Sequence, residues 1–206
     1  MLNIALPKGR LGDQVHQLFA SVGYGCAMLA EESRKLVLED ADAGIRYLLI
    51  KPMDVAVYVE RGAADVGVVG RDVLLETEPN VYELLDLALG KCELAVAAPD
   101  GFEEDYGAIL RVGTKYPHVA WRYYQGMGRD IEIIKLNGSI ELAPILGLSD
   151  VIVDIVETGA TLRENHLHVW EHIAPSSARL IANKRSYHFK QEEISRLLGA
   201  LEETSA

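Results

Sequence analysis

The 206-residue sequence is poor in cysteine and has no long apolar run. Its two cysteines, Cys26 and Cys92, lie far apart without Cys-x-x-Cys spacing, so no zinc site or dithiol motif is predicted, and both are expected to be buried free thiols. No segment is apolar over enough residues to span a membrane, and no export signal precedes the first expected strand. The sequence therefore predicts a cytoplasmic protein with no membrane partner.

Positive charge is also scarce. There are 20 lysines and arginines against 31 aspartates and glutamates, a formal net charge of −11. Because a nucleic-acid surface needs clustered basic side chains to neutralise phosphates, no nucleic-acid partner is expected. The basic residues that could serve a single phosphate, or equally lie in solvent, are Lys8 and Arg10 flanking Gly9, the neighbours Arg34 and Lys35, and Lys115 before Tyr116.

Hydrophobic residues make up 49% of the chain, which is ample for a packed core. Strand-like and helix-like segments alternate from the start, and this pattern favours a mostly parallel α/β architecture. The expected strands are 2–6, 46–50, 65–69, 93–98, 109–114 and 178–182. The expected helices are 11–22, 52–61 and 191–201, with a turn at 70–72.

A cationic loop separates the first expected strand from the first expected helix. Lys8, Gly9 and Arg10 occupy this loop. Ligands of open α/β sheets bind outside the carboxyl ends of the strands, so the loop is a candidate contact for a nucleotide phosphate. The alternative is an ordinary surface loop.

The run 151–165, with the sequence VIVDIVETGATLREN, places two carboxylates between a strand and a loop of small residues. Its β-branched residues predict a parallel strand covered on both faces, with Asp154 and Glu157 at or near its carboxyl end. Carboxylates at this edge can accept hydrogen bonds from the vicinal hydroxyls of a ribose.

The loop after the two carboxylates suits an anion. Residues 158–161, Thr-Gly-Ala-Thr, allow a ligand to approach the backbone closely and offer amide hydrogens and two hydroxyls. Thr161 and Glu164 have capping-box spacing, which would start a helix at the loop and add its positive dipole end. Together these features predict a ribose 5-phosphate site, although many α/β proteins have an acidic strand end before a Thr-Gly turn for other reasons.

This run resembles the phosphoribosyl-pyrophosphate loop of the ATP phosphoribosyltransferases, the enzymes that open histidine biosynthesis. Further blocks similar to that family are ALPKGRL at 5–11, GAADVGVVGRD at 62–72, TKYP at 114–117 and KLNGSIELAP at 135–144. The blocks follow the family's order and span nearly the whole chain. The resemblance is therefore far more specific than any one motif.

The resemblance implies an α/β chain with two lobes around a central cleft, similar to the type II periplasmic binding proteins. Residues 1–90 and 176–206 would form the first lobe, and residues 91–175 the second, which carries the phosphoribosyl-pyrophosphate loop. The chain looks like the family's short form, without a C-terminal regulatory domain. Short forms depend on a separate regulatory subunit that resembles histidyl-tRNA synthetase, so a hetero-oligomer with such a subunit is expected.

The implied reaction joins N1 of the adenine of ATP to C1 of phosphoribosyl pyrophosphate and releases pyrophosphate. By resemblance, Asp154 and Glu157 are the catalytic residues and hold the ribose hydroxyls. The residues expected to bind phosphoribosyl pyrophosphate are this pair together with Thr158, Gly159, Ala160 and Thr161. Magnesium would bind mainly through substrate oxygens and water, so no protein ligands for it are predicted.

By resemblance, the residues expected to contact ATP or pyrophosphate are Lys8, Gly9 and Arg10. Weaker candidates for these contacts are Lys51, Asp72 and Glu141. Asp72 and Glu141 could instead cap helices. Lys51 stands where the family pattern leads us to expect arginine, which replaces a bidentate fork with a point charge, and Ala56 stands in place of an expected proline. Both departures put substrate recognition at Lys51 in question.

Two further groups of residues have a chemical and a structural interpretation. His166, His168 and His172 lie close together, but residues two apart on a helix point away from each other, so a metal site is not predicted. Four aromatic residues could stack on adenine, although we expect them to have a core or interface role. They are Tyr116, Trp121, Tyr123 and Tyr124.

Two competing functions remain open. A non-catalytic two-lobed module could sense a small anion, or a phosphoribosyltransferase could act on a base other than the adenine of ATP. The absence of an export signal and of a DNA-binding segment argues against the first. The resemblance of the N-terminal and middle blocks favours ATP over another base.

Overall fold

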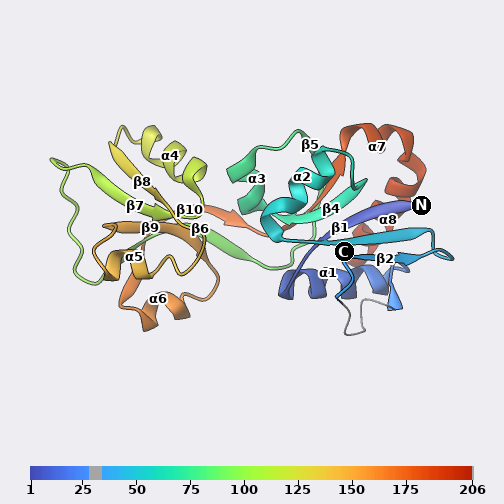
Figure 1. The fold of residues 1–206 in the computed structure, drawn as a ribbon, viewed down its shortest axis with the longest axis horizontal. Helices are drawn as coiled ribbons and strands as arrows, with labels where there is room; N and C mark the ends of the chain where they lie inside the picture. The colour runs from blue at the N-terminus through green and yellow to red at the C-terminus, as the bar shows by residue number, and fades with distance from the viewer. Residues whose placement is uncertain (28–33, 206) are drawn as a thin grey trace. The chain divides into compact units, whose positions relative to one another are not determined.

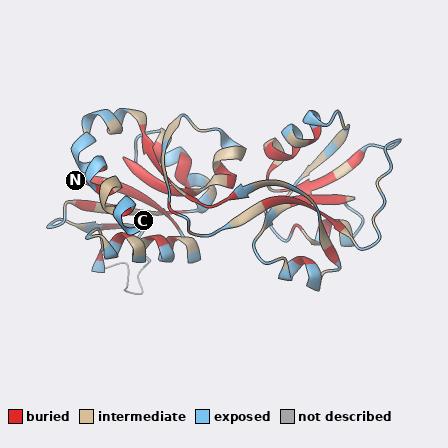
Figure 2. Ribbon diagram, turned by 180° about the vertical axis from the view of Figure 1, so that it is seen from behind, coloured by how far each residue is buried: buried red, intermediate tan, exposed pale blue. Residues whose placement is uncertain are grey.

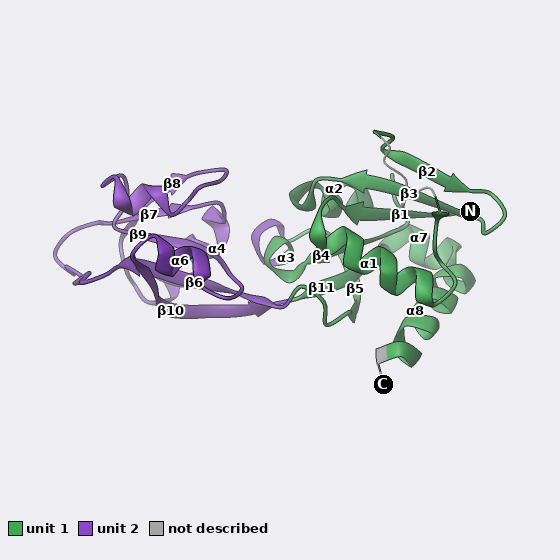
Figure 3. Ribbon diagram, turned by 90° about the horizontal axis from the view of Figure 1, so that it is seen from below, with its two compact units in different colours: residues 1–74, 78–90, 177–206 green, residues 75–77, 91–176 purple. Residues whose placement is uncertain are grey.

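The computed structural model describes residues 1–27 and 34–205, which form helices packed on two β-sheets (Figure 1). The chain divides into two compact units (Figure 3). Unit 1 comprises Met1–Leu74, Glu78–Gly90 and Ser177–Ala206, and unit 2 comprises Leu75–Thr77 and Lys91–Ser176. The C-terminal segment therefore returns to the unit in which the chain begins.

The sheet of unit 1 has six strands in the order β2-β3-β1-β4-β11-β5. Strand β1 lies parallel to β3 and β4, while β11 lies antiparallel between β4 and β5. Most residues of β1 are buried, as expected for a strand covered on both faces. The strands are β1 (Leu2–Pro7), β2 (Val37–Asp40), β3 (Ile45–Ile50), β4 (Val66–Gly70), β5 (Val81–Asp86) and β11 (Ala178–Asn183).

Helices cover both faces of this sheet. Phe19 of α1 and Leu197 of α8 share one buried cluster with Ile4 of β1, and residues three or four apart on each helix supply the apolar face. Helices α2 and α3 belong to the cluster on the other face. Figure 2 colours the buried residues of the strands and helices red. The helices are α1 (Arg10–Ser21), the 3-10 turn η2 (Pro52–Asp54), α2 (Val55–Glu60), α3 (Arg71–Thr77), α7 (Lys184–Phe189) and α8 (Gln191–Ser205).

The sheet of unit 2 has five strands in the order β10-β6-β9-β7-β8. Its central strand β9 pairs parallel with β7 and antiparallel with β6. Ala120 and Tyr124 of α4 pack on one face, and Leu162 of α6 packs with Ile152 on the other. The elements are β6 (Cys92–Pro99), β7 (Leu110–Thr114), α4 (Pro117–Gly126), β8 (Ile131–Lys135), α5 (Leu142–Ile145), β9 (Val151–Val156), α6 (Ala160–Glu164) and β10 (Leu167–Ser176).

Every expected strand and helix is present within a few residues of its predicted bounds, and both units are α/β. The predicted mostly parallel arrangement is wrong, because each sheet contains antiparallel as well as parallel pairs. The turn predicted at 70–72 is also wrong, since α3 begins at Arg71. Strands β2, β5, β8 and β10 were not predicted.

Two smaller expectations need correction. Cys26 is a buried free thiol as predicted, but Cys92 is only half-buried. The segment that contains His168 and His172 is strand β10, so the argument from helical spacing does not apply to it. No helix within residues 1–27 and 34–205 combines the length and apolarity that crossing a bilayer requires.

Candidate functional site

The first candidate site is the connection between β9 and α6 in unit 2. Asp154 is the fourth residue of β9, is half-buried, and lies on the same face as Ile152 and Val156. Its Oδ1 accepts a hydrogen bond of 2.8 Å from the backbone N–H of Ile155. Glu157 follows the last residue of the strand and is exposed. Both carboxylates thus lie at the carboxyl end of a central strand, as predicted.

The turn after Glu157 is built around Gly159. This residue has φ of +68°, a left-handed conformation that favours glycine, and it is the N-cap of α6. The N–H of Ala160 donates to Oγ1 of Thr158 at 3.3 Å. Thr161 is exposed, as is Thr158, so the turn is open to a ligand.

The predicted capping box at Thr161 and Glu164 is wrong. Helix α6 already begins at Ala160, and within the described structure Gly159 caps it without a side-chain hydrogen bond. The N-cap is Gly159 rather than Thr161, so the helix begins two residues earlier than the Thr-Glu pattern indicates. The helix has only five residues, so its dipole adds little to the anion site.

Arg163 lies beside this turn, and the sequence alone predicts no role for it. Its Nη1 donates to the backbone oxygen of Thr158 at 3.0 Å. A Cβ atom on Gly159 would lie 3.2 Å from the same Nη1, so glycine also gives the guanidinium room to fold back. The turn therefore carries a fixed positive charge beside its amides, a feature hidden in the sequence because Arg163 looks like an ordinary helical residue.

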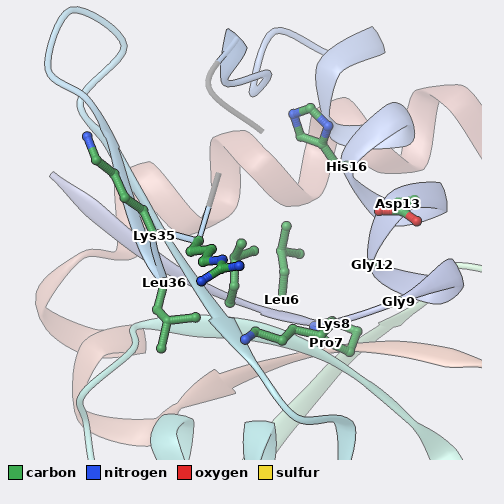
Figure 4. Close-up of a pocket in the computed structure, with 11 residues that line it drawn as sticks. Leu6, Pro7, Lys8, Gly9, Gly12, Asp13, His16, Lys35 and Leu36 are labelled. Atoms are coloured by element: carbon green, nitrogen blue, oxygen red, sulfur yellow. The ribbon is translucent and has the colours of Figure 1, made fainter. Parts of the chain in front are cut away.

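The second candidate site is a pocket of about 320 Å³ in unit 1 (Figure 4). Lys8 and Gly9 reach it from the loop between β1 and α1, and Arg34 and Lys35 reach it from the segment before β2. Basic residues from two segments that are distant in the sequence, Lys8 in one and Arg34 with Lys35 in the other, therefore line one pocket. The basic residues of both segments are evident in the sequence, but no local pattern in it predicts that they meet.

The pocket is electropositive. Lys8 and Arg34 bring two positive charges against the single carboxylate of Asp13, in a chain with a net charge of −11, while the side chain of Lys35 extends away from Lys8 in Figure 4. His16 of α1 also lines the pocket, and its Nε2 accepts a hydrogen bond of 3.2 Å from the N–H of Cys26. Burial lowers the pKa of His16, although the charge of Asp13 opposes this, so the ring is neutral at neutral pH. A small anion is the ligand that this lining favours.

The other predicted contacts lie outside this pocket. Arg10 begins α1, exposed Lys51 precedes η2, and Asp72 is buried in the first turn of α3. Glu141 precedes α5 in unit 2, but no side-chain capping bond is present there in the described structure. The alternative in which Asp72 caps a helix is wrong, because Gly70 is the N-cap of α3. None of these four residues lines the pocket at Lys8.

His168 and His172 each lie close to a carboxylate. Nδ1 of His172 lies 2.8 Å from a carboxylate oxygen of Glu93, and Nδ1 of His168 lies 3.4 Å from one of Asp100. Among the described residues, no three His, Cys, Asp or Glu side chains are placed to hold a metal ion.

Of the four aromatic residues, Tyr116 and Tyr124 are buried, Tyr123 is half-buried and Trp121 is exposed.

Comparison with known proteins decides the family. The family model described as "HisG: ATP phosphoribosyltransferase" matches residues 51–203. The chain is 56% identical to the ATP phosphoribosyltransferase of Brachyspira hyodysenteriae, over 98% of this chain and 99% of that protein. It is 52% identical to the ATP phosphoribosyltransferase of Caldanaerobacter subterraneus subsp. tengcongensis, over 98% of this chain and 97% of that protein. This chain belongs to the ATP phosphoribosyltransferase family.

A solved ATP phosphoribosyltransferase structure has the same fold. It is titled as the ATP phosphoribosyl transferase (HisG:HisZ) complex from Thermotoga maritima, and it matches with a TM-score of 0.88 and 38% identity over 98% of this chain and 97% of that one. The α/β fold of the type II periplasmic-binding-protein kind is thus confirmed, as is the assignment to the pentosyl-transferring enzymes. The N-terminal block at Lys8 lies outside the family model's match but inside the region shared with the relatives.

In this family member, Gly12 lets α1 approach the end of β1 beside the pocket. A Cβ atom on Gly12 would lie 1.8 Å from the carbonyl oxygen of Pro7. We expect Gly12→Ala to lower the free energy of unfolding by about 2 kcal/mol, because the helix must move off the strand. Chemical denaturation followed by circular dichroism measures this loss.

A matched control for Gly12→Ala is Gly199→Ala. Gly199 also lies in a helix, but a Cβ atom there meets no atom within 4 Å. Since alanine is a better helix former, Gly199→Ala should be neutral or more stable by up to about 1 kcal/mol. If both variants behave alike, the close approach of α1 to Pro7 does not require glycine.

Proposed function

We propose that this chain transfers the phosphoribosyl group of phosphoribosyl pyrophosphate to N1 of the adenine of ATP. The products are N1-(5-phosphoribosyl)-ATP and pyrophosphate, in the first step of histidine biosynthesis. The observation that carries this proposal is the family membership over nearly the whole chain. The two candidate sites supply chemistry that suits it.

The β9–α6 connection suits the ribose 5-phosphate part of the donor. The carboxylates of Asp154 and Glu157 can accept hydrogen bonds from the vicinal hydroxyls of the sugar. The amides of residues 158–161 and the hydroxyls of the two threonines can donate to the 5'-phosphate. The guanidinium of Arg163, held at the turn by its bond to Thr158, adds positive charge for that phosphate.

This chemistry requires no nucleophile from the protein. As pyrophosphate leaves, positive charge develops on the ribose, and a nearby carboxylate of Asp154 or Glu157 stabilises it more than it stabilises the ground state. Holding the sugar by its hydroxyls also fixes C1 for attack by N1 of adenine. The two carboxylates thus have a positioning and an electrostatic role.

The basic pocket at Lys8 and Arg34 suits the phosphate chain of ATP or the pyrophosphate group. Its volume and its excess of positive charge fit a small anion better than they fit an adenine ring. The positive φ of Gly9, +96°, lets the loop after β1 turn sharply into α1. The predicted contacts at Lys8 and Gly9 are therefore assigned here, and Arg34 and Lys35 are added to them.

Magnesium is proposed to enter bound to pyrophosphate oxygens and water. Mg²⁺ keeps much of its hydration shell and needs few protein ligands. When bound, the ion neutralises charge on the leaving group. The protein's own groups then need only bind the remaining anionic oxygens.

A regulatory partner is also proposed. The similar structure from Thermotoga maritima is titled as a HisG:HisZ complex. The chain covers 97% to 99% of the length of the two relatives compared above. We assign it the short-form arrangement, in which a HisZ-type subunit resembling histidyl-tRNA synthetase completes a hetero-oligomer.

An absorbance assay for phosphoribosyl-ATP tests the reaction and the partner together. The chain is incubated with ATP, phosphoribosyl pyrophosphate, magnesium and pyrophosphatase, with and without the HisZ-type subunit. Product formation that rises sharply with the subunit is the expected result. Binding of phosphoribosyl pyrophosphate without product under either condition would mean another acceptor base, and binding of neither substrate would favour the anion-sensing module.

A further inference from the structure

A second hollow lies in unit 1 and shares no residue with the pocket at Lys8. It measures about 500 Å³, which is within the size range of small-molecule sites. Glu60 and Arg61, at the end of α2, form one wall. Arg185 and Phe189 of α7, with the following Lys190, form the other.

The floor of this hollow is fixed by hydrogen bonds. The amide group of Asn183, only 8% exposed, donates to the carbonyl oxygens of Val59 at 2.8 Å and Glu60 at 3.0 Å. Its Oδ1 accepts from the N–H of Ser186 at 2.9 Å. One buried side chain therefore ties the end of α2 to the start of α7 and holds the two walls at a constant separation.

Only some of the basic side chains that line the hollow pair with a carboxylate. Lys190 donates to buried Asp65 at 2.6 Å, so its charge is matched. The carboxylate of the lining, Glu60, accepts a hydrogen bond of 2.8 Å from the N–H of Asn80. Arg61 and Arg185 are both exposed, and within the described part of the chain neither guanidinium pairs with a carboxylate. Two unpaired arginines on facing walls form an anion site in a chain whose net charge is −11, because a guanidinium fork binds phosphate through two parallel hydrogen bonds.

An aromatic surface accompanies the two arginines. Phe189 is 79% exposed, and the guanidinium carbon of Arg185 lies 5.7 Å from its ring centroid. A phenyl ring this exposed is unfavourable in water unless something covers it. The Arg185–Phe189 pair offers a flat, partly apolar surface on which a heterocyclic ring can stack.

We propose that this hollow binds a small phosphate monoester that carries a flat ring, which is the chemistry of a nucleotide. Arg61 and Arg185 bind the phosphate, and Phe189 stacks on the ring. The site is separate from both candidate sites described above, since they share no residue with it. The proposal therefore does not depend on the transferase reaction.

Nuclear magnetic resonance of the full-length chain, labelled with ¹⁵N, tests this site. The probes are adenosine 5'-monophosphate and inorganic phosphate. Saturable shifts of the amide signals of Gly62, Ser186 and Phe189 are expected with both, and tighter binding with the nucleotide. Shifts confined to Lys8, Gly9 or the turn at Gly159, or no saturable shift, would overturn the proposal.

Variants distinguish binding of the phosphate group from stacking of the ring. The double variant Arg61→Gln/Arg185→Gln should weaken both probes at this site by at least roughly tenfold. Phe189→Ala should weaken the nucleotide but leave inorganic phosphate unchanged. Arg196→Gln, an exposed arginine on α8 outside both pockets, is the matched charge control and should bind like the parent. Equal binding by the double variant and the parent would contradict the assignment.

Discussion

Replacing Asp154 with alanine is expected to lower kcat by roughly two to three orders of magnitude, the loss typical of removing one preorganised electrostatic contact to a transition state. The carboxylate lies near the carboxyl end of β9, which leads into the turn at Gly159. It would both fix the ribose hydroxyls and stabilise the positive charge on the sugar. Because β9 pairs with strands on both sides, truncating one half-buried side chain should leave the sheet intact.

Two further variants make the Asp154 result interpretable. Asp154→Asn keeps the shape but removes the charge, so it should be nearly as slow as the alanine variant if charge stabilisation dominates. Glu132→Gln removes an exposed carboxylate from β8 of the same sheet and should retain parental kcat. Steady-state kinetics and thermal unfolding are measured for all three. A folded Asp154→Ala enzyme with parental kcat would remove Asp154 from the mechanism.

The site in unit 2 could be predicted from sequence because its parts are contiguous. β-branched residues, two carboxylates and a small-residue turn follow one another between positions 151 and 161, so strand, edge and loop were all recognisable locally. The start of α6 was misplaced because a positive-φ glycine at Gly159 competes with the capping-box pattern. Local patterns identify which chemistry is present more reliably than they identify which residue begins a helix.

The basic pocket in unit 1 could be predicted only in part. Lys8 and Gly9 were identified because they join a strand to a helix, but Arg34 precedes β2, a short and mostly exposed strand with no clear apolar alternation. Its approach to Lys8 follows from the sheet order, in which β3 separates β2 from β1. Sheet order is a long-range property, and a single sequence carries no local pattern for it.

The edge strands were missed for a related reason. Strand β10 contains three charged or histidine residues in its first six and is only partly buried, and strand β8 has only half-buried and exposed positions. Such segments are stabilised by backbone pairing with a neighbour rather than by a continuous apolar run. The central strands, which are buried on both faces, were all predicted.

Replacing Asp65 with alanine is expected to lower the free energy of unfolding by about 3 kcal/mol, the lower end of the range for breaking a buried ion pair, because Lys190 keeps some contact with water. Asp65 is only 5% exposed. Its Oδ2 accepts from the N–H of Asn3 at 2.8 Å and from Nζ of Lys190 at 2.6 Å, and its Oδ1 accepts from Ser186 at 2.7 Å. The variant leaves these donors without their acceptor.

The Asp65 carboxylate connects segments from both ends of the chain. Asn3 belongs to β1, whereas Ser186 lies in α7 and Lys190 directly follows that helix. Nζ of Lys190 also donates to the backbone oxygen of Met1 at 2.8 Å, so losing Asp65 loosens the first residue as well. Urea unfolding followed by circular dichroism measures the loss. Asp42→Ala, at an exposed position between β2 and β3, is the control and should change stability by less than about 0.5 kcal/mol.

Acid titration shows whether the charge of Asp65 is what stabilises the fold. Burial alone would raise the pKa of this carboxyl, but hydrogen bonds from Lys190, Asn3 and Ser186, with the charge of Lys190, outweigh burial and lower it. A pKa that is lower in the folded state than in the unfolded state gives a stabilisation that is fully present above the unfolded value, about 3.9, and is lost as the pH falls through the folded value.

The informative quantity is the difference in unfolding free energy between the parent and Asp65→Asn, because other carboxylates titrate in both proteins. This difference should stay constant from neutral pH down to about pH 5 and then shrink below about pH 4. It shrinks because protonation removes from the parent the same charge that the asparagine variant already lacks. A difference that stays constant into acid would mean that shape and packing at Asp65, rather than its negative charge, hold the N-terminal strand to α7.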